Sequence, residues 1–297
     1  MSASVEALNK AARPKLKKQS QVLETLKRLC KNRAAMIGLI ILLVEIFIAI
    51  FGRWLMPYEY NTMDFTNACA APSFAHPMGT DDFGRDILSR ILFGTRYSLG
   101  LGFLGIVTSM IIGVIIGSIV GYFGGLTDSI IMRVVDIFQS IPGILLSIAI
   151  SSSLGSGFIN TVLALSFSHI PSNVRLLRGS ILNIRKMEYL EAADAINCSK
   201  FRTIVSHILP NSFAPMIVQG TMSIASIIMS AASLSYIGLG ILPPTPEWGA
   251  MLAGSRNFIR DYPFMVIFPG LAIAITVLSL NMLGDGLRDA LDPKLKD

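Results

Sequence analysis

Residues 190 to 210 read LEAADAINCSKFRTIVSHILP, a helix-turn-helix pattern of the kind found in soluble proteins, although long apolar windows stand on both sides of it. On a helical wheel, its first helix divides into a small apolar face and an acidic face. The apolar face comprises Tyr189, Ala192, Ala193 and Ile196, and the acidic face comprises Glu188, Glu191 and Asp194. Because alanines allow close approach, this short helix is predicted to fit into a groove on another protein. The alternative is a solvated loop with accidental periodicity.

The turn between the two helices is predicted at Asn197. The chain must reverse sharply there, and Asn is the residue other than Gly that best tolerates the left-handed conformation. Ser199 is placed to cap the second helix, which is predicted over 200–209 and leads into Pro210.

The composition indicates a protein that is solvated mostly by lipid. The 297 residues are 52% hydrophobic and 15% charged, and the mean hydropathy is +0.61, which is far from the balance of a soluble domain. The net charge of +6 could suggest nucleic acid as a partner. Its basic residues flank the apolar windows, however, where they orient the chain and meet anionic lipid. We therefore expect contact with membrane lipid and none with nucleic acid.

Five apolar windows define the predicted transmembrane helices, since a bilayer core requires about 20 apolar residues of helix. The windows span residues 34–52, 97–127, 137–174, 203–246 and 262–284. At about 1.5 Å per residue the third window is too long for one crossing, so a fold-back is predicted near 151–157. Glycines and prolines break the second half of the fourth window, which leaves 210–236 as its span. The predicted fold class is therefore all-α, a polytopic membrane protein with about six transmembrane helices.

Lys and Arg set the predicted orientation, because they accumulate on the cytoplasmic side of membrane proteins. With six spans and both termini in the cytoplasm, 19 of the 25 Lys and Arg residues fall on the cytoplasmic side. Seven spans, which would place the tail outside, are the weaker alternative.

This topology divides the chain into segments. A cytoplasmic N-terminal segment with an interfacial helix covers 1–33, a transmembrane domain covers 34–284, and a cytoplasmic tail covers 285–297. Within the domain, we expect an extracytoplasmic loop at about 53–96 and a cytoplasmic loop at about 177–208.

Motifs that carry covalent chemistry do not occur in the sequence. There is no G-x-x-x-x-G-K-[ST] loop, no H-E-x-x-H pair and no G-x-S-x-G elbow. The Cys and His residues show no ligand spacing for a metal ion. We therefore expect no catalytic residue, no metal site and no cofactor in this chain, so that energy for any work must enter through another polypeptide.

Small residues recur every four positions in the second window. They are Gly105, Ser109, Gly113, Gly117 and Gly121. Such a stripe predicts close packing of another helix.

Ionisable residues near the apolar windows are few. Glu45 lies well inside the first window, where an ionised carboxylate is costly unless it faces protein or water. It is assigned either to a solute pathway or to a hydrogen bond between helices. Asp136 is predicted to pair locally with Arg133, three residues before it. The stretch 243–249 is predicted to form a rigid extracytoplasmic cover with Trp248 near the lipid interface.

The stretch around Glu191 resembles the EAA loop of ABC-transporter permeases, whose general form is E-A-A-x3-G-x9-I-x-L-P. Glu191, Ala192 and Ala193 match its first positions. Asn197 stands where the family usually has Gly, and His207 stands where it has Ile. The helix-turn-helix pattern tolerates both departures.

Other blocks narrow the resemblance to the second permease type of the dipeptide, oligopeptide and nickel group. They lie at 79–86, 239–249 and 284–293, and the resemblance extends from about residue 25 to the C-terminus. It implies the type I fold of ABC importers and a subunit without its own ATPase site, located in the inner membrane of a bacterial cell. It also implies that the 188–208 loop is a coupling helix that fits a cleft of an ATP-binding subunit.

The same resemblance implies a set of partners and a substrate. The partners are a second homologous permease, which completes a heterodimeric pore, one or two ATP-binding subunits that hold ATP and Mg, and an extracytoplasmic substrate-binding protein. The substrate is a di- or oligopeptide.

Three alternatives stand beside this interpretation. Nickel or another small solute of the same group is the first. An ion-coupled secondary carrier is the second, and it would use intramembrane charges, of which the sequence offers little beyond Glu45 and Asp136. A membrane scaffold is the third, and it would keep the docking helix yet move no solute.

Overall fold

The described part of the chain consists of helices and loops. A computed structural model describes residues 21–291, and the predictions for residues 1–20 and 292–297 lie outside the described residues. The helices are α2 (Gln21–Lys31), α3 (Arg33–Leu55), α4 (Ile87–Phe123), α5 (Gly125–Gln139), α6 (Gly143–Leu154), α7 (Phe158–Ile184), α8 (Glu188–Ala195), α9 (Lys200–Arg202), α10 (Leu209–Tyr236), α11 (Trp248–Ser255) and α12 (Phe264–Leu291).

Four helical stretches are long and apolar enough to cross a membrane, namely α3, α4, the continuous run from α9 to α10, and α12. The pair α5 and α6 qualifies only jointly, because α5 has 15 residues and α6 has 12, and the two helices meet at 86°. Helix α7 is of similar length but carries Arg175 and Arg178, and it packs along α4, α10 and α6, so much of its surface faces protein. The all-α membrane fold is confirmed. Four spans, or five if the bent pair counts as one, are found among the described residues, so the count of six stays a prediction, with α7 as the candidate for the sixth.

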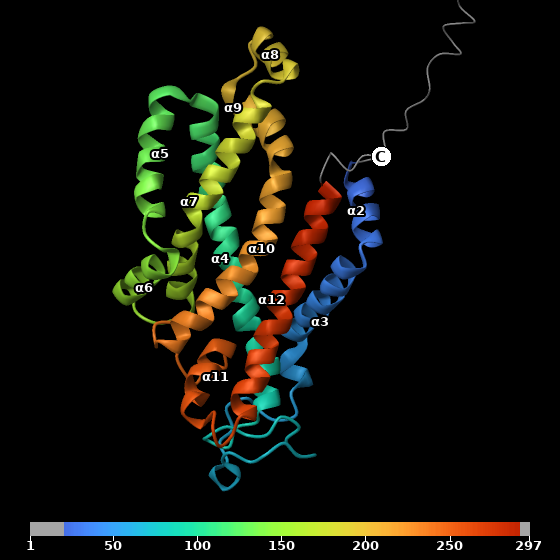
Figure 1. The fold of residues 1–297 in the computed structure, drawn as a ribbon, viewed down its shortest axis with the longest axis vertical. Helices are drawn as coiled ribbons and strands as arrows, with labels where there is room; N and C mark the ends of the chain where they lie inside the picture. Colours follow the sequence, from blue (N-terminus) through green and yellow to red (C-terminus); the bar gives the residue numbers. More distant parts are fainter. Residues whose placement is uncertain (1–20, 292–297) are drawn as a thin grey trace, which may run out of the picture.

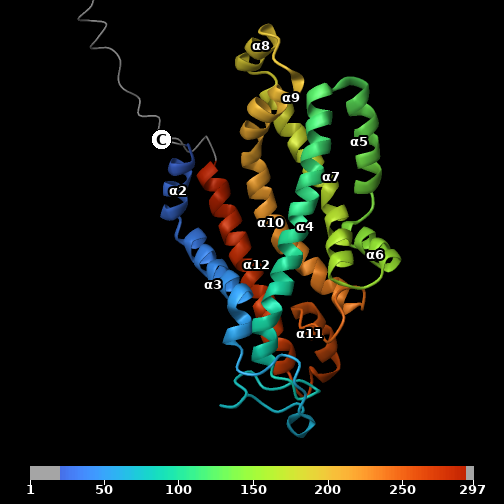
Figure 2. The same ribbon diagram turned by 180° about the vertical axis from the view of Figure 1, so that it is seen from behind.

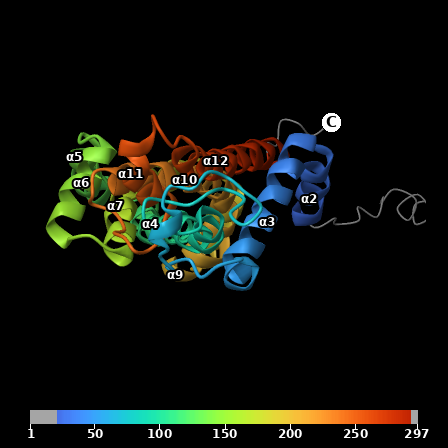
Figure 3. The same ribbon diagram turned by 90° about the horizontal axis from the view of Figure 1, so that it is seen from below.

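The helices form three groups across the molecule. Helices α4, α7 and α10 pack on one another at the centre, with α3, α12 and α2 on one side and α5 and α6 on the other (Figure 1, Figure 3). Leu101, Leu165 and Leu234 belong to the main core, where these central helices meet. Seen from both sides, α2, α8 and the end of α12 lie at one end, and α11 and the loop between α3 and α4 lie at the other (Figure 2).

Helix α4 begins ten residues before the apolar window, at Ile87, so the loop predicted at 53–96 is shorter than expected. Asp86 caps the helix, because its carboxylate accepts a hydrogen bond of 2.7 Å from the Ser89 N–H. Arg90, in the second turn, is buried and lies 3.6 Å from the Asp81 carboxylate. A hydropathy window stops at charged residues and therefore misses a helix whose first charges are paired within the protein.

Two other helices extend beyond their predicted ends because residues in their last turns are buried against other helices. Helix α7 continues to Ile184, inside the loop predicted at about 177–208, because Ile181 and Ile184 are buried. Helix α12 continues to Leu291, inside the tail predicted at 285–297, because Ala290 packs against α2 and the start of α3.

The third apolar window is broken twice. The predicted fold-back near 151–157 is confirmed, since α6 ends at Leu154 and the glycines that follow have positive φ. The part of the window before it, 137–150, was expected to be one continuous span, but it holds only the last residues of α5, a break at 140–142 and most of α6, and α5 itself begins at Gly125, before the window. Pro142 lacks an N–H, so it cannot continue the hydrogen-bond ladder of α5.

Two ion pairs hold α5 against α7. Asp136 lies 2.6 Å from Arg175, and Asp128 lies 2.6 Å from Arg178. The predicted pairing of Asp136 with Arg133 is therefore wrong. The sequence favoured a partner for Asp136 on its own helix, whereas in the fold its partner, Arg175, comes from the adjacent helix α7.

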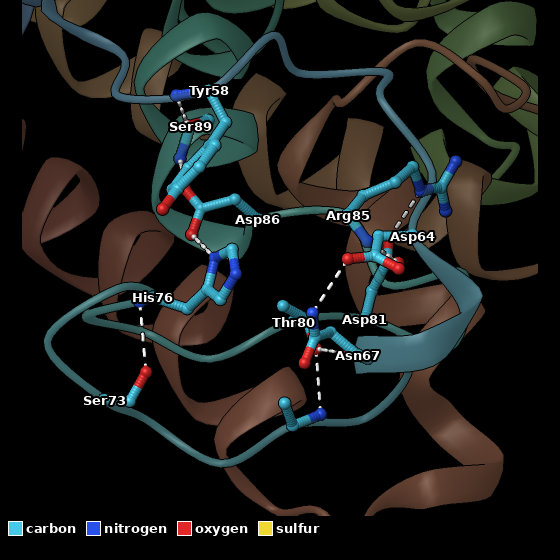
Figure 4. A network of polar contacts seen from close by, with 11 residues as sticks. Tyr58, Asp64, Asn67, Ser73, His76, Thr80, Asp81, Arg85, Asp86 and Ser89 are labelled. Carbon is cyan, nitrogen blue, oxygen red and sulfur yellow. Dashed lines mark hydrogen bonds and ion pairs between the residues drawn. The ribbon is translucent and has the colours of Figure 1, made fainter.

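A polar network orders the loop between α3 and α4 (Figure 4). The Arg85 Nε donates to the Asp81 carboxylate at 2.6 Å, and the His76 Nδ1 lies 3.0 Å from the Asp86 carboxylate. Burial raises the pKa of the Asp82 carboxyl, and the Asp81 carboxylate adds to that rise. The loop is thereby fixed as a cover on the first turns of α4.

Candidate functional site

Helix α8 projects from one end of the molecule, in the loop between α7 and α10 (Figure 1). It begins with Glu188 and Glu191 in its first turn, where carboxylates favour the positive end of the helix dipole. The helix closes through a hydrogen bond of 3.0 Å from the Cys198 N–H to the Ala193 carbonyl, the pattern of a left-handed cap. Asn197 has a φ of +56°, which confirms the left-handed turn predicted from the sequence.

The inward face of α8 rests on the protein core. Leu190 and Ala193 are buried, and Leu190 packs in a cluster with Ile184 and Ile208 at the ends of the flanking helices. Ala193 is therefore unavailable to a partner, which corrects its assignment to the outward face. The wheel grouped Ala193 with Ala192 by angle, with Ala193 at the edge of the small apolar face, but the buried Leu190 determines which side of the helix turns inward and takes Ala193 with it.

The outward face of α8 carries the remaining predicted docking residues, apart from Asp194, whose side chain lies outside the described residues. Glu188, Tyr189, Glu191, Ala192, Ile196 and Asn197 are exposed. Ile196 is 79% exposed and Tyr189 is 39% exposed. The Tyr189 hydroxyl also accepts a hydrogen bond of 3.4 Å from the Asn211 side chain, which ties α8 to the start of α10.

The helix predicted at 200–209 contains a π turn. Helix α9 passes into π geometry at Thr203–Ile208, where the Leu209 N–H reaches back five residues to the Ile204 carbonyl. The π turn is explained by Pro210, which has no N–H to donate to the carbonyl four residues earlier. The helical hydrogen bonds therefore change from a spacing of four residues to a spacing of five. Ser199 precedes α9, but its side chain makes no capping hydrogen bond, which corrects that prediction.

A pocket of about 290 Å³ lies beneath α8. Glu191, Arg185 and Lys200 line it, at the point where α4 ends against α7 and α9. The Arg185 guanidinium lies 3.5 Å from the Gly121 carbonyl in the last turn of α4, and the Lys200 ammonium lies 5.5 Å from the Phe123 ring. The pocket thus brings a residue of α8 together with the end of α4 and with residues that follow α7 and begin α9.

The small-residue stripe of α4 contacts two helices rather than one. A Cβ placed on Gly113, Gly117 or Gly121 would meet α7, at 2.6 Å from Asn173, 3.1 Å from Leu177 and 2.9 Å from Ile181 respectively. Gly105 faces Ile227 of α10 instead, at 3.1 Å. The Ser109 hydroxyl accepts a hydrogen bond of 3.0 Å from the Asn173 amide. The stripe lets α4 approach α7 and α10 closely.

Glu45 is buried between α3 and α12. The Thr276 hydroxyl lies 2.7 Å from its Oε1, and its Oε2 is buried without a hydrogen-bond partner among the described residues. The sequence left Glu45 assigned either to a solute pathway or to a hydrogen bond between helices. The contact with Thr276 is a hydrogen bond between helices α3 and α12.

Glu247 is a buried residue that the sequence analysis did not identify. Its carboxylate accepts hydrogen bonds of 2.8 Å from the N–H groups of Gly249 and Ala250 and from the Ser235 hydroxyl. It thereby caps α11 and ties it to the end of α10. Trp248 beside it is only 2% exposed, so its predicted position at the lipid interface is wrong. Sequence offered no signal, since Glu is an uncommon helix cap.

Comparison with known families decides the class of the protein. Residues 113–297 match the family described as binding-protein-dependent transport system inner membrane component. Residues 20–77 match the N-terminal transmembrane domain of oligopeptide transport permease C.

The chain is an ABC-transporter permease.

Three curated relatives cover nearly the whole permease. The dipeptide transport system permease protein DppC of Alkalihalophilus pseudofirmus is 45% identical over 92% of this chain and 90% of the relative. The glutathione transport system permease protein GsiD of Pectobacterium atrosepticum is 44% identical over 91% and 90%. The di/tripeptide transport system permease protein DppC of Pseudomonas aeruginosa is 39% identical over 97% of both chains.

A solved structure shares the fold of the permease. A chain of the inward-facing MetNI methionine ABC transporter superposes with a TM-score of 0.54 and 17% identity, over 68% of this chain and 97% of that one. The type I permease fold expected from the sequence is confirmed. The protein is a multi-pass subunit of the bacterial inner membrane in a system that depends on a binding protein, and it is not itself an ATPase.

Proposed function

We propose that this permease is the transmembrane subunit of an ATP-driven importer of di- and oligopeptides, and that it forms half of a heterodimeric pore. The peptide assignment rests on its relatives, since three permeases named for dipeptides, di/tripeptides and glutathione are 39–45% identical to it over more than 90% of its length. All three named substrates are small peptides or peptide-like molecules.

Helix α8 is proposed as the element that docks on an ATP-binding subunit. The observation that carries this proposal is the arrangement of α8 itself. Its inner face is anchored through Leu190, while Tyr189, Ala192 and Ile196 are exposed at the tip. Exposed apolar and small residues on a short helix are typical of helix-in-groove recognition. Glu188 and Glu191 add an acidic edge that complements basic residues on a partner.

The remaining partners follow from the same proposal. One or two ATP-binding subunits hold ATP and Mg, a second homologous permease supplies the other half of the pore, and an extracytoplasmic binding protein delivers the peptide. The end of the molecule with α2, α8 and the end of α12 then faces the cytoplasm, with both termini there, and the loop between α3 and α4 faces outward. The Lys and Arg distribution supports this orientation.

The docking role is tested by co-purification of the complex in mild detergent. Ala192→Trp places a bulky ring on the exposed face of α8, and we expect loss of the ATP-binding subunit because the groove cannot accept the ring. Ala34→Trp is the matched control, since Ala34 is also an exposed alanine but lies at the start of α3. The control should retain every subunit.

Retention of the second permease by both variants would show that Ala192→Trp is folded and inserted. Equal recovery of the ATP-binding subunit with both variants would refute the docking role of α8.

A further inference from the structure

A groove with both polar and apolar residues in its lining lies where the bend between α5 and α6 meets α7 and α10. Its volume is about 360 Å³, within the range of small-molecule binding sites. The chain leaves helical geometry at 140–142, and the two helices diverge by 86°. We call this site the bend groove.

Broken backbone within a membrane protein restricts what can cover it. Polar N–H and C=O groups that lack helical partners cannot face lipid, so such segments lie against protein or line a water-filled cavity. At the start of α6 no side chain caps the free N–H groups. In many transporters a broken helix of this kind forms the substrate site.

Polar side chains from three helices line the bend groove. Gln139 ends α5, His169 and Ser172 lie near the middle of α7, and Ser226 and Ser230 lie one turn apart on α10. Ser172 and Ser226 are exposed, and His169 and Ser230 are half-buried. An open polar surface is unfavourable toward lipid, which indicates that water or solute faces this side of α10.

Other serines at the groove have a structural task. The Ser168 hydroxyl donates to the Gly143 carbonyl at 3.0 Å, which fixes the first turn of α6 on α7. Ser147 and Ser168 also share a hydrogen bond. The hydrogen bonds of Ser147 and Ser168 therefore hold α6 on α7 and fix the shape of the groove. Ser226 and Ser230 take no part in these bonds.

The lining combines apolar residues, among them Ile141, Ile144 and Leu165, with polar groups that carry no formal charge. Among the described residues that line the groove, none is Asp, Glu, Lys or Arg. Hydroxyl, amide and neutral imidazole groups both donate and accept hydrogen bonds. A peptide backbone presents one donor and one acceptor at most residues, whatever its side chains. This match favours an uncharged amide backbone over a cation or an anion as the occupant.

We propose that the bend groove is the part of the translocation route where this chain contacts its solute, and that Ser226, Ser230 and His169 bind the peptide backbone. The inference rests on the proposed function and adds a site to it. Recognition through the backbone lets peptides with different side chains pass the same surface.

Cysteine accessibility tests the groove in the complete transporter in proteoliposomes. In a variant whose three native cysteines, Cys30, Cys69 and Cys198, are replaced by Ser, Ser230→Cys is treated with a small, charged methanethiosulfonate. The matched control is Met229→Cys, because Met229 is the adjacent residue of α10, is 56% exposed and does not line the groove. A thiol reacts as its thiolate, which forms in water and not in lipid.

We expect Ser230→Cys to react roughly tenfold faster than Met229→Cys, and a transported dipeptide with ATP to slow the reaction several-fold. Equal, slow rates at both positions would overturn the inference. A fast reaction that the transported dipeptide leaves unchanged would overturn the peptide assignment of the groove.

The same vesicles separate this inference from the proposed function. If the cysteine-free parent takes up dipeptide with ATP while the groove fails either test, only the inference is refuted. If neither the cysteine-free parent nor the native complex takes up dipeptide, the proposed peptide function is refuted. The peptide assignment of the groove is then refuted as well.

Discussion

Asn197 shows how one residue determines the position of α8. Its left-handed backbone, with φ at +56°, lets the chain reverse between α8 and α9. The Cys198 N–H then closes the helix on the Ala193 carbonyl, and Ala193 is buried. The exposed face of α8 is thus oriented by a turn that few residues adopt without strain.

The first prediction concerns this turn. Asn197→Val should destabilise the loop by about 1–2 kcal/mol, because a β-branched residue is strained in the left-handed region. Asn197→Gly should not, since Gly adopts that region freely. Peptide-stimulated ATP hydrolysis by the reconstituted transporter is the measurement. We expect it to fall in the Val variant and to persist in the Gly variant, and equal activities would contradict a role for the turn.

The second prediction concerns Glu45. Its contact with Thr276 joins α3 to α12 and lies outside the bend groove. Glu45→Gln keeps an oxygen that accepts from the Thr276 hydroxyl, so uptake should stay within about twofold of the parent. Thr276→Val removes the hydrogen bond and should lower the thermal stability of the detergent-solubilised complex. Loss of uptake in Glu45→Gln with unchanged stability would place Glu45 in the solute pathway instead.

At the scale of single elements, the stripe of α4 makes close helix contacts that leave no room for a side chain larger than glycine. The third prediction is that Gly113→Ala destabilises the protein by about 1–3 kcal/mol, the usual range for overpacking, since its Cβ would lie 2.6 Å from Asn173 Cβ. Gly179→Ala on α7 is the control, because nothing lies within 4 Å of its added Cβ. Thermal unfolding of the purified complex measures both, and an equal change in the two variants would contradict the packing account.

Sequence patterns predicted those elements whose cause is local. The apolar windows located α3, α10 and α12, and the end of α10 at Tyr236 follows from the glycines and prolines beyond it. The left-handed turn at Asn197 follows from the intrinsic preference of Asn. In each case the decisive residues lie within a few positions of the feature that they determine.

Elements set by distant contacts were missed or misplaced. The early start of α4 depends on pairing of Arg90 with Asp81, and the inward turn of Ala193 depends on the anchor Leu190. The bend groove collects residues from α5, α6, α7 and α10, which no single window relates. The docking face was therefore only partly predictable, and the groove was not.

At the scale of the whole molecule, continuous helices join the two regions for which we propose functions. Helix α8 lies at one end, and α10 runs from beneath it to the bend groove and on to α11 (Figure 1). Helix α8 packs through Leu190 on Ile184 and Ile208, at the ends of the helical segments that lead to α7 and α10, and both α7 and α10 line the groove. This geometry is suited to alternating access, in which closure of the ATP-binding subunits is transmitted to the solute route.

The most direct test of this account is uptake of a labelled dipeptide by proteoliposomes that contain the complete transporter and its binding protein. We predict ATP-dependent accumulation by the parent and by Ala34→Trp, and a loss of roughly tenfold or more in Ala192→Trp, because tenfold corresponds to only about 1.4 kcal/mol of lost docking energy. Accumulation that needs no ATP, or that Ala192→Trp supports as well as the parent does, would contradict a peptide importer coupled through α8.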